Sequence, residues 1–354
     1  MSVREFKCPH CGGIMHFSPE DGKVTCEYCE SEFSAADLEQ YAAVLEEKVQ
    51  DKMDWAQPDE SHTARESTIY TCPACGGEII TDDVQAATRC PYCDTPAVMT
   101  SRVSGVFEPD MIIPFSVTKE QAQQAYRDFC RKKPLLPSLF TKQARIESIT
   151  GIYVPFWLFD CDSNVTAEYR ATRVTHWSDR RFDYTKTDHY HIFRRGDMQF
   201  RAVPVDGSKK LDNAYTESIE PFDCAKAVPF QMGYLTGFLA DKYDENAQTA
   251  QQRANERIRQ SALDAARETV HGYATLVPEQ SGVQLSNTKA SYALLPVWLL
   301  NTKFNGKIYT FAMNGQTGRF VGKLPSSAAK GAGLFFGLTA AITAVLYLLQ
   351  LLLF

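Results

Sequence analysis

The sequence predicts an α+β protein, and three observations support this fold class. Paired Cys-x-x-Cys motifs occur twice within the first hundred residues. Between residues 103 and 325, segments with strand-like alternation are separated by segments with helical periodicity. The final segment, residues 331–354, contains no charged side chain. Together they predict two small N-terminal ribbons, a mixed α/β-sheet domain and one C-terminal transmembrane helix.

The cysteine pattern is an internal repeat with a 64-residue offset. Each unit opens with Cys-Pro-x-Cys-Gly-Gly and closes with Tyr-Cys, and its two Cys pairs are equally spaced. Two such pairs provide the tetrahedral four-sulfur shell that structural zinc prefers, although the same shell also suits iron. We therefore predict two rubredoxin-like, four-cysteine zinc ribbons, each holding one structural Zn2+. The predicted ligands are Cys8, Cys11, Cys26 and Cys29 in the first ribbon, and Cys72, Cys75, Cys90 and Cys93 in the second.

The charge of the chain argues against nucleic acid as the partner of these ribbons. The whole chain has a formal net charge of −6. Residues 1–34 carry three basic and six acidic side chains, and residues 66–102 carry two basic and five acidic ones. Binding to phosphate groups requires clustered Lys and Arg, so these surfaces repel nucleic acid and suit a protein partner better.

The C-terminal segment, residues 331–354, has the length and composition of a membrane-spanning helix. It would extend about 36 Å as a helix, which exceeds the roughly 30 Å hydrocarbon layer. Lys323 and Lys330 precede it, so the positive-inside rule places the rest of the chain in the cytoplasm. Reduced metal-binding thiols fit that compartment, and the polar N-terminus is unlike a secretory leader. We expect a single-pass, tail-anchored protein of the inner membrane.

The remaining chain divides at changes of periodicity. We expect the first ribbon in residues 1–34, an amphipathic helix (35–55) and a flexible linker in 35–66, and the second ribbon in 67–102. The α+β domain then occupies 103–325. Within it we predict a short strand at 110–117, a helix at 119–132 capped by Thr118 with Gln121, and a long helix at 245–271 capped by Asp244.

A second, weaker repeat predicts two related β units in one antiparallel or mixed sheet. Residues 155–160 (PFWLFD) match residues 296–301 (PVWLLN), and further β sequence follows each copy. We expect Trp157 and Trp298 to anchor the core. We predict separate strands at 151–160 and 166–175, β structure over 182–201, and hairpin turns at 304–307 and 314–318.

Candidate catalytic groups are few, and we predict no catalytic residue. His189 and His191 lie two residues apart on one face of a predicted strand, where they provide a possible metal site with His176 as a third ligand. Cys161 and Cys224 adjoin carboxylates, which disfavour an activated thiolate. The sequence contains no GxxxxGK[ST] motif, which argues against a helicase or another P-loop NTPase.

The chain resembles a group of uncharacterised bacterial membrane proteins that carry transcription-factor-IIB-type double zinc ribbons. Besides the paired CPxCGG and CxYC motifs, the resemblance rests on IIPF (112–115), GIYVPFW (151–157), GYLTGFLADKYD (233–244) and MNGQTGRFVGKLP (313–325). Relatives are sometimes labelled primosomal helicase, a label that the missing phosphate-binding loop argues against. The resemblance implies zinc and membrane attachment, but no activity.

These observations favour a non-enzymatic zinc protein that docks or organises a protein partner at the cytoplasmic face of the membrane. A membrane-held, nucleic-acid-associated factor is the alternative from another class. A metal-dependent enzyme using His189 and His191 is the third possibility.

Overall fold

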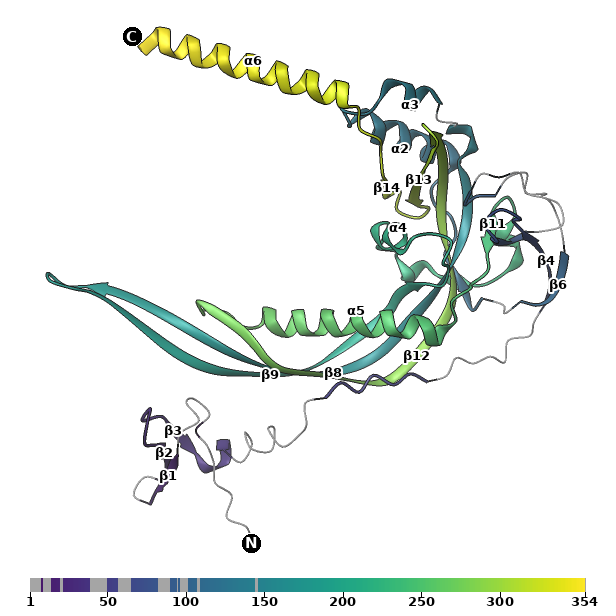
Figure 1. Cartoon of the computed structure of the whole chain (residues 1–354). Coiled ribbons are helices and arrows are strands. Elements are labelled where there is room, and N and C mark those ends of the chain that lie inside the picture. Colours follow the sequence, from purple (N-terminus) through teal and green to yellow (C-terminus); the bar gives the residue numbers. More distant parts are fainter. Residues whose placement is uncertain are drawn as a thin grey trace. The chain divides into compact units, whose positions relative to one another are not determined.

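The protein is a mixed α+β structure with antiparallel sheets, as a computed structural model of the 354-residue chain shows (Figure 1). The structure describes residues 8, 14–19, 22–38, 50–56, 65–81, 90–93, 95, 101–106, 109–143 and 146–353. It forms two compact units, each assembled from three separate stretches of the chain. One unit contains residues 1–57, 159–203 and 251–289, and the other contains 58–158, 204–250 and 290–354.

The first unit begins with a small antiparallel sheet around the first cysteine motif. Its strands are β1 (Met15–Ser18), β2 (Lys23–Cys26) and β3 (Glu32–Ser34), in the order β1-β2-β3. Gly22 adopts a positive φ of 70° in the β1–β2 turn, a conformation that glycine tolerates without strain. Helical residues 35–38 follow, as predicted, and residues 39–49 of the predicted helix lie outside the described residues.

Residues 50–55 correct the end of the predicted helix, because they are not helical. The backbone N–H of Lys52 donates to Val283 O, and the N–H of Leu285 donates to Lys52 O. Trp55 Nε1 donates to Asn255 Oδ1 at 2.6 Å. These long-range bonds satisfy backbone groups that the predicted helix would have paired locally, so tertiary contacts override the helical periodicity here.

The same unit contains a helix packed on long strands. It includes the distal parts of β8 (Thr150–Ser178) and β9 (Asp183–Asp206), most of α5 (Ala247–Glu268), and the start of β12 (Thr275–Phe304). Ala262 and Ala266 of α5 share a buried cluster with Val165, Ala167 and Ala171 of β8, Ile192 of β9 and Val283 of β12. Small side chains let the helix approach the strands closely. The predicted cap is corrected: Asn246, not Asp244, accepts the N–H of Thr249.

The predicted separate strands at 151–160 and 166–175 are one continuous strand, β8. The intervening residues 161–165 alternate between buried and partly exposed side chains, so the strand period of two runs through them. Apparent polarity at Asp162 and Asn164 therefore marks one face of the strand and not a turn.

The second unit is built on a mixed sheet, and three of the strands in that sheet, β8, β9 and β12, also supply residues to the first unit. Strand order in the large sheet is β10-β7-β12-β8-β11-β5-β4-β6, with β13 and β14 added beside β12, and β9 beside β8. β7 pairs with β12 and β11 pairs with β8 in parallel, whereas the β4–β5, β5–β11, β7–β10, β12–β13 and β13–β14 pairs are antiparallel. The short strands are β4 (Arg65–Thr71), β5 (Glu78–Thr81), β6 (Ser101–Val106), β7 (Met111–Ile112), β10 (Val228–Pro229), β11 (Leu239–Asp241), β13 (Lys307–Asn314) and β14 (Phe320–Gly322).

Helices cover this sheet and one extends from it. α2 (Lys119–Arg131) starts at the predicted capping box, in which Thr118 Oγ1 accepts from Gln121 N and Gln121 Oε1 accepts from Thr118 N. Its buried Tyr126 packs with Phe140 of α3 (Ser138–Gln143) and Phe311 of β13. The other helices are α4 (Asn213–Ser218), α6 (Ala328–Leu353) and the 3-10 turns η1 (Ile146–Ser148), η2 (Cys224–Lys226) and η3 (Met232–Leu235).

The two related tryptophans have equivalent surroundings, which confirms both as core anchors. Trp157 is 4% exposed and its Nε1 donates to Glu245 O, while Trp298 is 5% exposed and donates to Val117 O. Each indole is therefore buried with its one donor satisfied. The predicted hairpin at 304–307 also forms, with Asn305 and Gly306 both at positive φ, as a type I′ turn requires.

Four motifs quoted for the family resemblance meet around one aromatic side chain. Phe115 stacks on Phe238 with ring centroids 4.1 Å apart, and it contacts Tyr153 and Trp298 edge-on. A Cβ added at Gly315 would lie 2.6 Å from the Phe115 ring, so only glycine fits at that position. The four motifs therefore meet in one packed core.

Candidate metal centres

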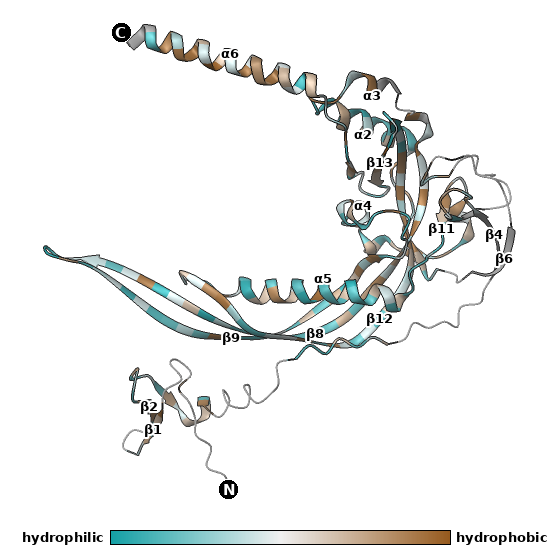
Figure 2. Ribbon diagram, in the orientation of Figure 1, coloured by the Kyte–Doolittle hydropathy of each residue, from teal (hydrophilic) through white to brown (hydrophobic). Residues whose placement is uncertain are grey.

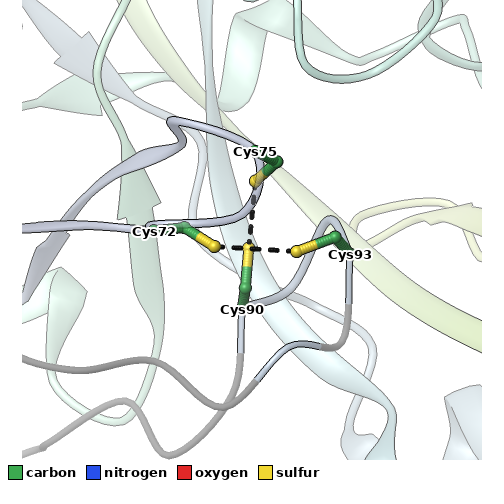
Figure 3. A group of neighbouring side chains, drawn as sticks. All are labelled: Cys72, Cys75, Cys90 and Cys93. Carbon is green, nitrogen blue, oxygen red and sulfur yellow. Dashed lines mark hydrogen bonds between the residues drawn. The ribbon is translucent and has the colours of Figure 1, made fainter.

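Four sulfurs of the second cysteine motif converge on one point. The Sγ atoms of Cys72 and Cys93 lie 3.6 Å apart, as do those of Cys75 and Cys90, and all four lie within 4.8 Å of one another (Figure 3). A tetrahedral ion with metal–sulfur bonds of about 2.3 Å places its sulfurs roughly 3.8 Å apart. A disulfide would need about 2.05 Å. The arrangement therefore fits a four-thiolate metal centre.

Local backbone geometry points these side chains inward. The N–H of Cys72 donates to Gly77 O and the N–H of Gly76 donates to Cys72 O, both at 2.8 Å. Gly76 has a φ of 71°, which closes the tight turn between the two bonds. Cys72 and Cys90 are 2% exposed, whereas Cys75 is exposed. The site is thus half-embedded, with one edge at the surface.

In each centre, the sulfur of the last cysteine contacts the hydroxyl group of the residue two positions further along the chain. Cys93 Sγ lies 3.3 Å from Thr95 Oγ1, and Cys29 Sγ lies 3.3 Å from Ser31 Oγ. Burial alone would raise the pKa of Cys93, but its hydrogen bonds with Thr95, Cys72 and Cys75 lower that pKa to about 7. Sequence reasoning missed Ser31 and Thr95, although both occupy the same position in the 64-residue repeat.

The first centre repeats this design. Sγ of Cys8 lies 3.6 Å from Sγ of Cys29, and Cys26 joins them within 4.8 Å. The predicted fourth ligand, Cys11, lies outside the described residues. The backbone bond from Cys26 N to Ser31 O matches the bond from Cys90 N to Thr95 O in the second centre. Both motifs therefore form similar knuckles.

The second centre is tied to the sheet by a buried polar network. Tyr92, between the last two ligands, donates its hydroxyl to Asp241 Oδ2 at 2.6 Å. Ser208 Oγ also donates to Oδ2, and Lys210 Nζ lies 3.0 Å from Oδ1. Burial raises the pKa of Asp241, while the Lys210 ammonium and the two hydroxyl donors oppose that rise.

A second tie comes from the β12 strand. Asn301 Nδ2 donates to the carbonyl oxygens of Pro91 and Tyr92, at 2.7 and 2.8 Å. Asp241 and Asn301 are far from the cysteines in sequence, so no local sequence pattern predicts that either residue contacts the metal-binding motif. A buried Asp in an apolar β11 strand (Leu239-Ala240-Asp241) is the signal that could have drawn attention to this site.

The predicted histidine site does not assemble among the described residues. His189 is exposed, and His176 Nδ1 contacts Thr185 Oγ1 at 2.9 Å. His191 Nε2 instead lies 3.5 Å from Glu168 Oε2 and 3.3 Å from Glu279 Oε2. Across the described part of the chain, the groups of His, Cys, Asp and Glu with metal-binding geometry are the two cysteine clusters.

Two of the other cysteines, Cys130 and Cys161, sit in surroundings that favour the protonated thiol. Burial raises the pKa of Cys161 to about 11, with the nearby Arg201 opposing that rise. Burial likewise raises the pKa of Cys130, which adjoins Tyr126 in the α2 core. Cys224 Sγ contacts Phe222 O at 3.7 Å.

The C-terminal helix is long and apolar enough to cross a membrane. α6 has a span from Ala328 to Gln350 with mean hydropathy 2.1, and none of that window is buried within the protein. Figure 2 shows its largely hydrophobic ribbon. It begins three residues before the predicted segment, and the N–H of Lys330 donates to Ser327 Oγ in its first turn.

These features define a class: an α+β protein with two N-terminal cysteine clusters of zinc-ribbon type and one apolar C-terminal helix. The chain is 33% identical over 353 residues to "Uncharacterized protein YdjG" of Bacillus subtilis (strain 168), covering 99% of this chain and 98% of that protein. It belongs to the same family as YdjG. No protein-family model matches the chain, and no solved structure matches it. The transcription-factor-IIB-type relationship of the ribbons therefore stays a prediction.

Proposed function

We propose that the protein is a membrane-anchored zinc protein that holds a protein partner at the cytoplasmic face of the membrane, without catalysing a reaction. Its ribbons carry one structural Zn2+ each. The observation that carries the proposal is the set of four converging sulfurs at Cys72, Cys75, Cys90 and Cys93 in a chain with a spanning-length apolar helix. A closed four-thiolate shell leaves no position for a metal-bound water, so the ion serves the fold.

The proposed orientation rests on redox state and flanking charge. The four sulfurs that converge at Cys72, Cys75, Cys90 and Cys93 would bind a metal as reduced thiolates, which fits a reducing compartment. Lys323 and Lys330 lie beside the start of α6, where cytoplasmic basic residues favour retention of the preceding chain.

Support for a protein partner comes from the surface of the first ribbon. Three large apolar side chains of this ribbon are exposed: Ile14 at 59%, Phe17 at 58% and Tyr28 at 73%. The ribbon has fewer than forty residues, so these side chains form a large share of its surface. Exposed Glu27 and Glu30 lie beside them in the sequence. Apolar anchors with an acidic rim fit a protein surface that is apolar and basic, whereas a nucleic-acid backbone would meet like charge.

Site-specific photo-crosslinking tests the proposed role in intact cells. A photoreactive amino acid replaces Phe17 in the full chain, and a matched chain carries it at Glu256, an exposed position on α5. We expect a light-dependent protein adduct in the membrane fraction for position 17 and none for position 256. Adducts sensitive to nuclease, equal adducts at both positions, or no adduct at position 17 would contradict a protein partner at this surface.

A further inference from the structure

The β8–β9 hairpin ends in an exposed aromatic tip. β12 begins at Thr275, whose hydroxyl lies 2.6 Å from that of Thr172, and β8 continues beyond this point to Ser178. Six more residues extend a strand by about 20 Å. Figure 1 shows the hairpin reaching past the ends of α5 and β12. Residues 175–187 are all exposed, so this ribbon buries little apolar surface of its own.

The tip concentrates aromatic side chains at the surface. Trp177 and Tyr184 stack with centroids 5.3 Å apart and an interplanar angle of 9°, and Phe182 contacts Tyr184 edge-on. Trp177 is 50% exposed and Phe182 is 63% exposed. Aromatic rings that are exposed to solvent on a two-stranded ribbon contribute little to folding. Their exposure therefore indicates that they bind another molecule or a membrane.

The turn is ordered and carries two adjacent arginines at its apex, which Asp179 and Asp183 balance in formal charge within residues 177–184. Asp179 Oδ1 accepts the backbone N–H groups of Arg181 and Phe182, and its Oδ2 accepts the hydroxyl of Tyr184. The carboxylate of Asp179 is therefore hydrogen-bonded within the turn. Arg180 and Arg181 are both exposed at the apex, and Lys186 pairs with Asp188 further down the hairpin.

We propose that this tip, Trp177 to Tyr184, binds the interface of an anionic lipid bilayer. Tryptophan and tyrosine favour the boundary between hydrocarbon and headgroups, and arginine beside them attracts anionic headgroups. The chain has a net charge of −6, so attraction to an anionic surface has to come from local groups such as this exposed arginine pair. The inference rests on the proposed membrane anchoring, which keeps the chain at a bilayer.

Tryptophan fluorescence of the full chain tests this site directly. The chain has four tryptophans; Trp157 and Trp298 are buried, Trp55 is partly buried, and α6 has none. The full chain is reconstituted into phosphatidylcholine vesicles with or without phosphatidylglycerol, with acyl chains brominated just below the headgroup. We expect brominated anionic vesicles to quench and blue-shift a component of the emission that Trp177→Phe removes. Arg180→Gln with Arg181→Gln should reduce tip binding on the order of tenfold.

Vesicle flotation separates failure of the tip from failure of the anchor. If the chain floats with vesicles at high salt but the wild type and Trp177→Phe are quenched equally, the tip proposal is wrong and the anchor stands. If the chain does not float, the proposed membrane function fails as well. Quenching of Trp177 by single-stranded nucleic acid or by a second copy of the chain, without quenching by lipid, would also overturn the proposal.

Discussion

Tyr92 Oη donates to Asp241 Oδ2 at 2.6 Å, which joins the second cysteine knuckle to the buried β11 strand. The corresponding tyrosine of the first knuckle, Tyr28, is 73% exposed. Two knuckles that share the Cys-x-Tyr-Cys pattern therefore stand in different environments. Among the described residues, a buried carboxylate joins the second knuckle alone to a sheet, so the two metal centres should contribute differently to stability.

Replacing Tyr92 by Phe should destabilise the protein, and the same change at Tyr28 should not. Tyr92→Phe removes one donor to a buried carboxylate, at a cost of about 1–3 kcal/mol. Tyr28→Phe alters an exposed hydroxyl and should stay within about 0.5 kcal/mol. Chemical unfolding of the two full-length, metal-loaded variants measures the difference. Equal unfolding midpoints would show that the Tyr92–Asp241 bond contributes nothing.

Loss of metal from the two centres should have unequal structural consequences. Cys93→Ser and Cys29→Ser remove equivalent ligands, because the two positions are 64 residues apart in the repeat. We expect Cys93→Ser to increase hydrogen exchange in β5, β11 and around Asn301, since the knuckle holds Tyr92 and Pro91 in place. Cys29→Ser should increase exchange only in β1–β3. Exchange that increases to the same extent in β11 in both variants would contradict this asymmetry.

The carboxylate of Asp162 should contribute stability that depends on pH. Hydrogen bonds from Asn287 and Arg201, both at 2.7 Å, lower the pKa of Asp162 below its ordinary value. A lowered pKa favours the ionised form in the folded state. The contribution is therefore complete above the ordinary pKa of about 3.9 and is lost as pH falls through the lowered value.

The variant Asp162→Asn measures that contribution. Its melting temperature should lie below that of the wild type at neutral pH, and the gap should close as the solution is acidified. Asp183→Asn, an exposed change near the hairpin tip, is the control. A gap that is independent of pH would mean that the ionised carboxylate is not the stabilising species.

Local patterns were sufficient for some elements and not for others. The Thr118–Gln121 box, the Asn305-Gly306 turn and the cysteine spacing each specify contacts within a few residues or within one repeat. The helix predicted for 35–55 was wrong at residues 50–55, because Lys52 pairs with residues more than 230 positions away. Asn246 caps the helix in place of the predicted Asp244, because Asp244 Oδ1 accepts the backbone N–H of Lys209 and not one from the helix.

The surroundings of the metal centres were the least predictable part. Tyr92 and Asp241 are 149 positions apart, and the pairing depends on β11 lying between β5 and β8. Periodicity identifies which residues are buried but not which strands are neighbours. For the same reason, no sequence pattern indicated that His191 lies beside Glu168 and Glu279.

Metal content of the purified full-length protein tests the central claim most directly. Elemental analysis should find two zinc ions per chain in the wild type. Cys93→Ser and Cys29→Ser should each retain about one, and the double variant none. Protein without bound metal, with disulfides linking Cys72, Cys75, Cys90 and Cys93, would contradict the account. Iron in place of zinc would keep the four-sulfur geometry and correct the identity of the ion.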